Sequence, residues 1–175
     1  MKKIVLNILV LAVPILLSAQ SSQVEKIFDQ YSGEEGYTSI QITKYMFELF
    51  SKVANEEEDK EFKKITSKLT GIKILTLDSL TNIKREQNFY KEITSSLSKT
   101  DYKDLMIIKD GTEEIKFIIR EMNAKISELV MIVGGNGEAV LIVLLGDINL
   151  KQISKLSKSM DIKGFEHLDK VDDKN

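Results

Sequence analysis

The chain has 175 residues, of which 30% are charged and 42% hydrophobic, and its formal net charge is −2. This balance excludes a strongly basic nucleic-acid-binding domain and supplies enough apolar side chains for one sizeable core. The absence of cysteine excludes disulfides, thiol catalysis and the lipid-modified cysteine that anchors many exported bacterial proteins.

The N-terminal residues have the pattern of a secretory signal. Lys2 and Lys3 precede an apolar run over residues 4–17, which is short for a membrane span, and small residues follow it. We expect cleavage between Ala19 and Gln20, which removes the two lysines and lowers the net charge from −2 to −4. The sequence therefore predicts a periplasmic or extracellular chain, with no integral membrane span after cleavage.

The domain organisation predicted from this pattern is simple. Residues 1–19 form a signal peptide, residues 20–162 form a single domain, and the charged residues 163–175 form a disordered tail.

Helices and strands alternate in the first half of the mature chain. Apolar residues at helical spacing predict helices near residues 24–31, 46–53, 55–70 and 83–97. Alternating and apolar runs predict strands over residues 37–43 and 72–78. We expect Gly71 to end the third helix in a left-handed conformation.

Two hairpins are predicted after residue 100. The Asp110-Gly111 pair favours a tight turn that sets Met106 opposite Ile115. For the second hairpin two registers compete, and the Asn136-Gly137 turn is favoured because it sets Val133 opposite Val140. A final helix is expected to start at a cap on Asn149.

These elements predict an α+β fold. Its mostly antiparallel sheet includes a C-terminal four-strand region of two hairpins, and this region packs against helices.

Four segments of the chain resemble a known family. Residues 38–46 (TSIQITKYM), 71–77 (GIKILTL), 102–106 (YKDLM) and 128–156 are similar to the pattern of the domain of unknown function 4252 family. Its members are uncharacterised exported proteins of Bacteroidota. The resemblance implies a fold and a location, but no activity or catalytic residue.

Candidate chemical motifs favour structural interpretations. His167 is the only histidine and lies in the predicted tail, away from any Ser-His or His-metal arrangement. Glycines 134–137 lack the Gly-Lys-Ser/Thr ending of a phosphate-binding loop, so a hairpin is favoured. We therefore predict no catalytic residue, no metal site and no cofactor, and expect that the chain is not an enzyme.

One feature suggests interaction, because residues 130–133 and 140–145 are apolar on both faces of the predicted sheet. Either a helix covers the second face, or this face meets a partner protein, a second copy or an apolar ligand. The residues expected to form this surface are Val130, Ile132, Leu141 and Val143.

The leading hypothesis is a non-enzymatic binding or protein-interaction module, with a homodimer or an envelope protein as partner and no nucleic acid. The alternatives are a carrier for a small apolar ligand and an enzyme that uses carboxylates.

Overall fold

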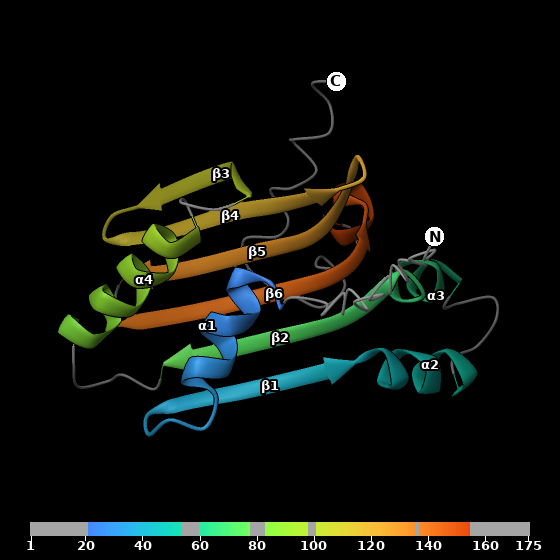
Figure 1. Ribbon diagram of the computed structural model, residues 1–175, viewed down its shortest axis with the longest axis horizontal. Helices are drawn as coiled ribbons and strands as arrows, with labels where there is room; N and C mark the ends of the chain where they lie inside the picture. Colours follow the sequence, from blue (N-terminus) through green and yellow to red (C-terminus); the bar gives the residue numbers. More distant parts are fainter. Residues whose placement is uncertain (1–20, 54–59, 78–82, 98–100, 136, 155–175) are drawn as a thin grey trace, which may run out of the picture.

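The computed structural model describes residues 21–53, 60–77, 83–97, 101–135 and 137–154. Its centre is a six-stranded sheet in the order β1-β2-β6-β5-β4-β3, with every neighbouring pair antiparallel (Figure 1). The elements are α1 (Gln23–Tyr31), β1 (Tyr37–Thr43), α2 (Lys44–Val53), α3 (Lys60–Thr66), β2 (Leu69–Leu77), α4 (Ile83–Leu97), β3 (Tyr102–Asp110), β4 (Glu113–Met122), β5 (Lys125–Gly135) and β6 (Glu138–Ile148). The predicted α+β class is confirmed.

Helices α1 and α4 cover the first face of the sheet (Figure 1). Val24, Ile27 and Phe28 of α1 follow helical spacing and are buried, as are Phe89, Ile93 and Leu97 of α4. They pack against alternate residues of the central strands, which face this side because side chains alternate along a strand.

The second face carries its own apolar cluster. Phe47 of α2, Ile65 of α3 and two residues of the helical segment 150–154 pack against β4, β5 and β6. Described helical segments therefore lie on both faces of the sheet. This arrangement supports the alternative in which a helix covers the second face of the apolar strands.

Ion pairing fixes α1 to the sheet. Lys73 of β2 is 7% exposed and points from the first face toward α1. Its Nζ lies 3.1 Å from a carboxylate oxygen of Glu25 and 5.1 Å from the ring centroid of Phe28. A buried ammonium needs such partners, because burial without them costs several kcal/mol.

The register of the second predicted hairpin is confirmed, and that of the first is wrong by two residues. Val133 pairs with Val140 and Met131 with Ile142, as expected. In the first hairpin Asp110 pairs with Glu113, and Met106 therefore lies opposite Phe117 instead of Ile115. Gly111 has a φ of +59° and occupies the first central position, which suits a type II′ turn. A shift of two keeps the side chains between Met106 and the turn on the same faces, whereas the bulge between Asp104 and Met106 brings Leu105 and Met106 against the same apolar cluster.

The predicted end of the third helix is also wrong. α3 ends at Thr66, and β2 starts at Leu69, so Gly71 lies within a strand, beside a bulge. The expected start of this helix at residues 55–58 lies outside the described residues. The cap at Asn149 is confirmed, because its Oδ1 accepts a hydrogen bond from the backbone N–H of Gln152 at 3.0 Å.

Candidate functional site

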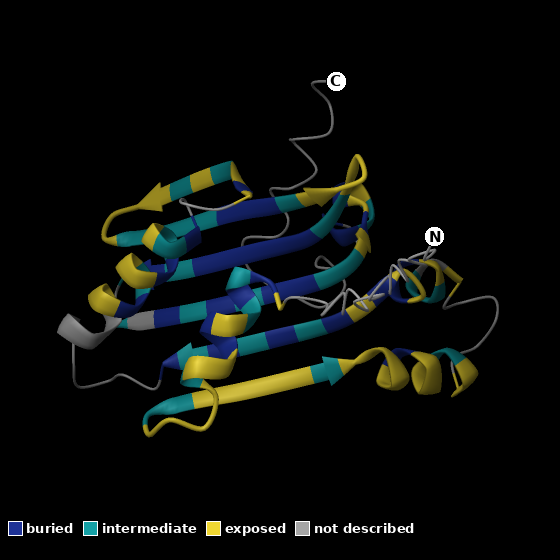
Figure 2. Cartoon of the chain, in the orientation of Figure 1, coloured by how far each residue is buried: buried dark blue, intermediate teal, exposed yellow. Residues whose placement is uncertain are grey.

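Among the described residues, the largest set of exposed apolar side chains lies on α2 and the adjoining strand β1. We name it the β1–α2 surface and define it by Ile40, Tyr45, Met46, Leu49, Phe50 and Val53. Val53 is 79% exposed and Tyr45 66%, whereas of the α2 residues only Phe47 is buried. Figure 2 shows exposure along most of β1 and α2, in contrast to the buried central strands. Clustered exposed apolar residues of this kind mark interaction sites in soluble proteins.

The local sequence explains why this surface forms. β1 runs into α2 with no intervening loop, so the helix extends beyond the end of the strand (Figure 1). Apolar residues occupy more than one side of the ten-residue helix, and the sheet can bury only one of them. Phe47 fills that buried side, and the remaining apolar side chains stay in solvent.

β1 is also an edge strand without the usual protection. Among the described residues it pairs with one strand, β2. Its seven residues, YTSIQIT, contain no charge and no proline, and its pairing with β2 has no bulge. Edge strands normally carry charges, prolines or bulges that prevent pairing with another chain.

The opposite edge strand, β3, has those features. It carries Lys103, Asp104, Lys109 and Asp110, and its pairing with β4 is interrupted by a bulge between Asp104 and Met106. The two edges of one sheet thus differ in the property that controls strand addition, and only β1 is suited to it.

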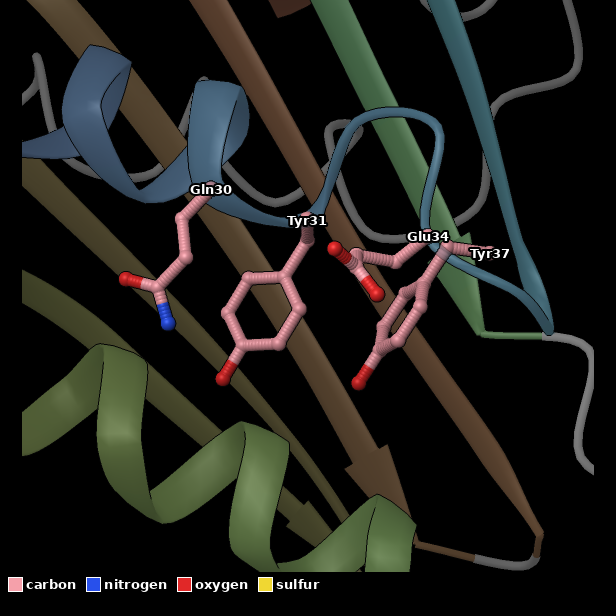
Figure 3. Close-up of a pocket in the computed structure, with 4 residues that line it drawn as sticks. All are labelled: Gln30, Tyr31, Glu34 and Tyr37. Carbon is pink, nitrogen blue, oxygen red and sulfur yellow. The ribbon is translucent and has the colours of Figure 1, made fainter.

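A hollow of about 320 Å³ lies between α1 and the start of β1, lined by Gln30, Tyr31, Glu34 and Tyr37 (Figure 3). The Tyr31 hydroxyl donates a 2.5 Å hydrogen bond to Glu92 of α4. The rings of Tyr31 and Tyr37 lie 4.9 Å apart, and both contact Phe89. These contacts tie α1 to α4 and to the start of β1, so we assign the hollow a structural role.

A groove of about 370 Å³ separates α2 from α3. It is lined by Lys44, Phe47, Glu48, Ser51, Lys52, Thr66 and Ser67. Lys44 and Glu48 form an exposed pair at 3.8 Å, so the charges in this groove partly neutralise each other. The groove borders the β1–α2 surface and gives it a polar rim.

A buried polar network links β3, β4 and β5. Glu128 is 6% exposed and accepts hydrogen bonds from the Tyr102 hydroxyl and, at 2.8 Å, from Arg120 Nη1. Burial, together with the hydrogen bond to Glu128, raises the pKa of the Tyr102 hydroxyl well above its ordinary value. The hydrogen bond with Glu128 raises the pKa of the Arg120 guanidinium. The carboxylate is therefore committed to two partners, which is typical of a structural ion pair.

The glycines of the second hairpin serve packing. A Cβ on Gly134 would lie 2.6 Å from a ring atom of Tyr90, so the absent side chain lets α4 approach β5. The Tyr90 hydroxyl in turn donates a 2.7 Å hydrogen bond to Glu114 of β4, which lowers the pKa of that carboxyl. The structure thus supports the hairpin interpretation of this segment over a phosphate-binding loop.

The predicted interaction residues are wrong. Val130, Ile132, Leu141 and Val143 are all 0% exposed and lie in the cluster beneath α1 and α4. Among their neighbours in the same strands, Val133, Val140 and Ile142 are partly exposed and lie on the other face. The expected cleavage site, Ala19 and Gln20, lies outside the described residues.

Sequence analysis missed the exposed residues of α2. Met46, Leu49, Phe50 and Val53 have the spacing of a buried helical face, and that spacing alone predicts core. The available signal was the excess of apolar residues, because Tyr45, Phe47 and Phe50 cannot all share one narrow face of a helix.

The part of the chain that the structure describes holds neither a cluster of metal-ligating residues nor a helix suited to span a membrane. There, histidine, aspartate and glutamate residues form no group of three or more placed to hold a metal ion. No helix in those ranges combines the length and apolar character needed to cross a membrane.

The fold and the exposed surface define a single-sheet α+β protein in which the edge strand β1 carries no charge, no proline and no bulge. The chain belongs to the family described as a domain of unknown function (DUF4252), whose model matches residues 31–156. This match spans β1 to β6 and confirms the resemblance seen in the sequence. Comparisons with curated proteins and with solved structures give no match.

Proposed function

We propose that this chain is an exported, non-enzymatic protein-interaction module of the periplasm that binds a strand along the outer edge of β1 around Ile40. The single observation that carries the proposal is the asymmetry between the two sheet edges. β3 has charges and a bulge, whereas β1 has neither. Strand addition supplies main-chain hydrogen bonds, and neighbouring apolar side chains supply specificity.

The adjoining helix supports the same proposal. Tyr45, Leu49 and Phe50 of α2 are exposed and lie directly after the strand. Aromatic and large aliphatic side chains are enriched at the centres of protein interfaces. A partner strand on β1 would therefore meet apolar side chains at the end of the edge as well.

Export rests on the signal pattern at the N-terminus and on the expected cut between Ala19 and Gln20. The alternative functions have weaker support. The two hollows described above are open to solvent instead of enclosed, which suits the burial of a small apolar ligand poorly. The buried carboxylate of Glu128 is already paired with Arg120 and Tyr102, which leaves it little capacity for acid-base chemistry.

A labelled strand peptide tests the proposal. The probe is a synthetic copy of residues 36–43 with added terminal lysines, and its binding to the mature chain is measured by fluorescence anisotropy. We expect saturable binding that is abolished by Ile40→Lys on β1. The matched control is Ile107→Lys on β3, because Ile107 is 46% exposed and Ile40 48%. Binding that is equally sensitive to both substitutions, or no binding to a chain shown to be monomeric, would refute the proposal.

A further inference from the structure

The residues of α2 divide into two opposite sides of the helix. One side lines the groove between α2 and α3, and it consists of Lys44, Phe47, Glu48, Ser51 and Lys52. The other side is apolar and exposed throughout, and it consists of Tyr45, Met46, Leu49, Phe50 and Val53. Residues one, four and five positions apart share a side of a helix. α2 is therefore an amphipathic helix whose apolar side points away from the groove.

This apolar side faces in the same direction as the outer edge of β1. α2 directly follows β1, and α3 closely precedes β2, so the two helices lie at the same end of two neighbouring strands (Figure 1). α3 flanks α2 on the side of β2, so the side of α2 opposite α3 lies outward. Figure 1 also shows that α2 continues beyond β1 in nearly the direction of the strand. The edge of β1 around Ile40 and the apolar side of α2 thus adjoin as one surface.

The side chains of β1 differ between the two faces of the sheet. Ile40 and Ile42 point to the second face, where Ile42 packs against the apolar cluster. The alternate residues Ser39, Gln41 and Thr43 point to the first face. A strand added beside them gains apolar contacts on one face only, so a segment with alternating polar and apolar side chains fits this edge best.

The dimensions of the surface set the length of segment that can cover it. Residues 40–43 span about 13 Å at the rise of a strand. The ten residues of α2 span about 15 Å at the rise of a helix. An extended chain rises about 3.3 Å per residue, so roughly eight or nine residues cover both.

We infer that the partner is an extended segment of about eight or nine residues, with alternating polar and apolar side chains along β1 and large apolar side chains over α2. This inference rests on the proposed function, because it names the chemistry of the segment bound at the same edge. Large apolar residues are required at one end because the outward side of α2 offers five apolar side chains and no charge.

Two labelled peptides of identical composition test the inference by fluorescence anisotropy on the mature chain. Each contains a copy of residues 39–43 and has lysines at both ends. One carries the block Leu-Phe-Leu-Phe before the copy, and the other carries it after. Every strand pair in the described sheet is antiparallel, and antiparallel pairing places the N-terminal part of the partner over α2. We therefore expect the peptide with the N-terminal block to bind at least about tenfold tighter than its isomer.

A substitution on α2 shows whether that helix causes the preference. Phe50→Gln should remove the difference in affinity between the two peptides. The matched control is Met122→Gln at the end of β4, because Phe50 and Met122 are both 51% exposed, and it should leave the difference unchanged. Folding of both variants is checked by circular dichroism.

The outcomes separate this inference from the proposed function. Two peptides of equal affinity, or a preference that Phe50→Gln and Met122→Gln reduce alike, overturn the inference. If the peptide of residues 36–43 still binds in these cases, the proposed function stands, whereas binding of no peptide overturns both.

The same variant tests the other occupants of an apolar helix side. Sedimentation equilibrium reports a second copy of the chain, and co-sedimentation with phosphatidylethanolamine–phosphatidylglycerol vesicles reports a lipid surface. A dimer that dissociates on Phe50→Gln, or vesicle binding that this substitution abolishes, would also overturn the inference.

Discussion

The buried pair of Arg120 and Glu128 should contribute strongly to stability, and Arg120→Met tests this. The substitution keeps much of the aliphatic volume but leaves the carboxylate of Glu128, 6% exposed, without a cation. Removal of one member of a buried pair typically costs 3–5 kcal/mol. The side chain of Arg120 is 24% exposed, so we expect the lower end of that range, about 3 kcal/mol.

The measurement is urea denaturation of the mature chain, with thermal unfolding as a second readout. For a domain of this size, a loss of about 3 kcal/mol lowers Tm by roughly 6–12 °C. The control is Lys103→Gln, which breaks the exposed Lys103–Glu121 pair and should cost about 0.5 kcal/mol.

A combined variant separates the cost of an unpaired charge from loss of packing. Replacing the whole network by Arg120→Met, Glu128→Leu and Tyr102→Phe leaves no buried charge at this position, and such replacements are often neutral or stabilising. We expect the triple variant to be more stable than Arg120→Met alone. A triple variant less stable than the single one, or an Arg120→Met variant no less stable than the Lys103→Gln control, would refute the reasoning.

Three further predictions concern α4, its contacts and export. Gly134→Ala should destabilise the fold by about 2 kcal/mol in urea denaturation, because the added methyl overlaps the Tyr90 ring, and this cost should vanish in a Tyr90→Ala background. Tyr90→Phe removes the hydrogen bond that lowers the pKa of Glu114, so it should cost about 1 kcal/mol at pH 7. A carboxyl group whose pKa is lowered on folding stabilises the folded state fully above its unfolded pKa and progressively less below it. The difference in unfolding free energy between Tyr90→Phe and the parent should therefore narrow as the pH falls below about 4.5. A difference that widens in acid contradicts this assignment. Intact mass of the protein recovered from the envelope should correspond to a chain that starts at Gln20, and a mass that retains residues 1–19 would contradict cleavage.

Strongly periodic segments were predictable from local sequence. The bounds of β1 at Tyr37–Thr43 and of α4 at Ile83–Leu97 match the expected ranges. The β5–β6 register also followed from sequence, because one turn set apolar residues opposite each other and the competing turn did not.

The first hairpin shows where local rules are insufficient. The predicted register and the observed one both keep Met106 and Ile108 on the same face, so burial does not distinguish them. The choice depends on whether Asp110 belongs to the turn or to the strand. In the structure the turn has a positive φ at Gly111 and uses Thr112 as its second central residue, which leaves Asp110 paired with Glu113.

The candidate site was harder to predict because exposure depends on tertiary packing. β5 and β6 are apolar at successive positions, so their sequence does not show which alternate set lies beneath α1 and α4. Val130 and Val133 are the same residue type within one apolar run, but Val130 is fully buried and Val133 only partly buried. The exposure of the apolar residues of α2 likewise depends on tertiary structure, because little of the sheet extends beneath this helix.

The position of β6 in the sheet determines the order in which the molecule can fold. It is the last of the described strands along the chain, but it lies between β2 and β5, and its pairing with β2 joins residues such as Leu77 and Ala139. Contacts between residues so distant in sequence form slowly, because a long loop must close first. The hairpins from β3 to β6 can assemble locally, whereas β2 cannot pair along its inner edge until β6 has been synthesised.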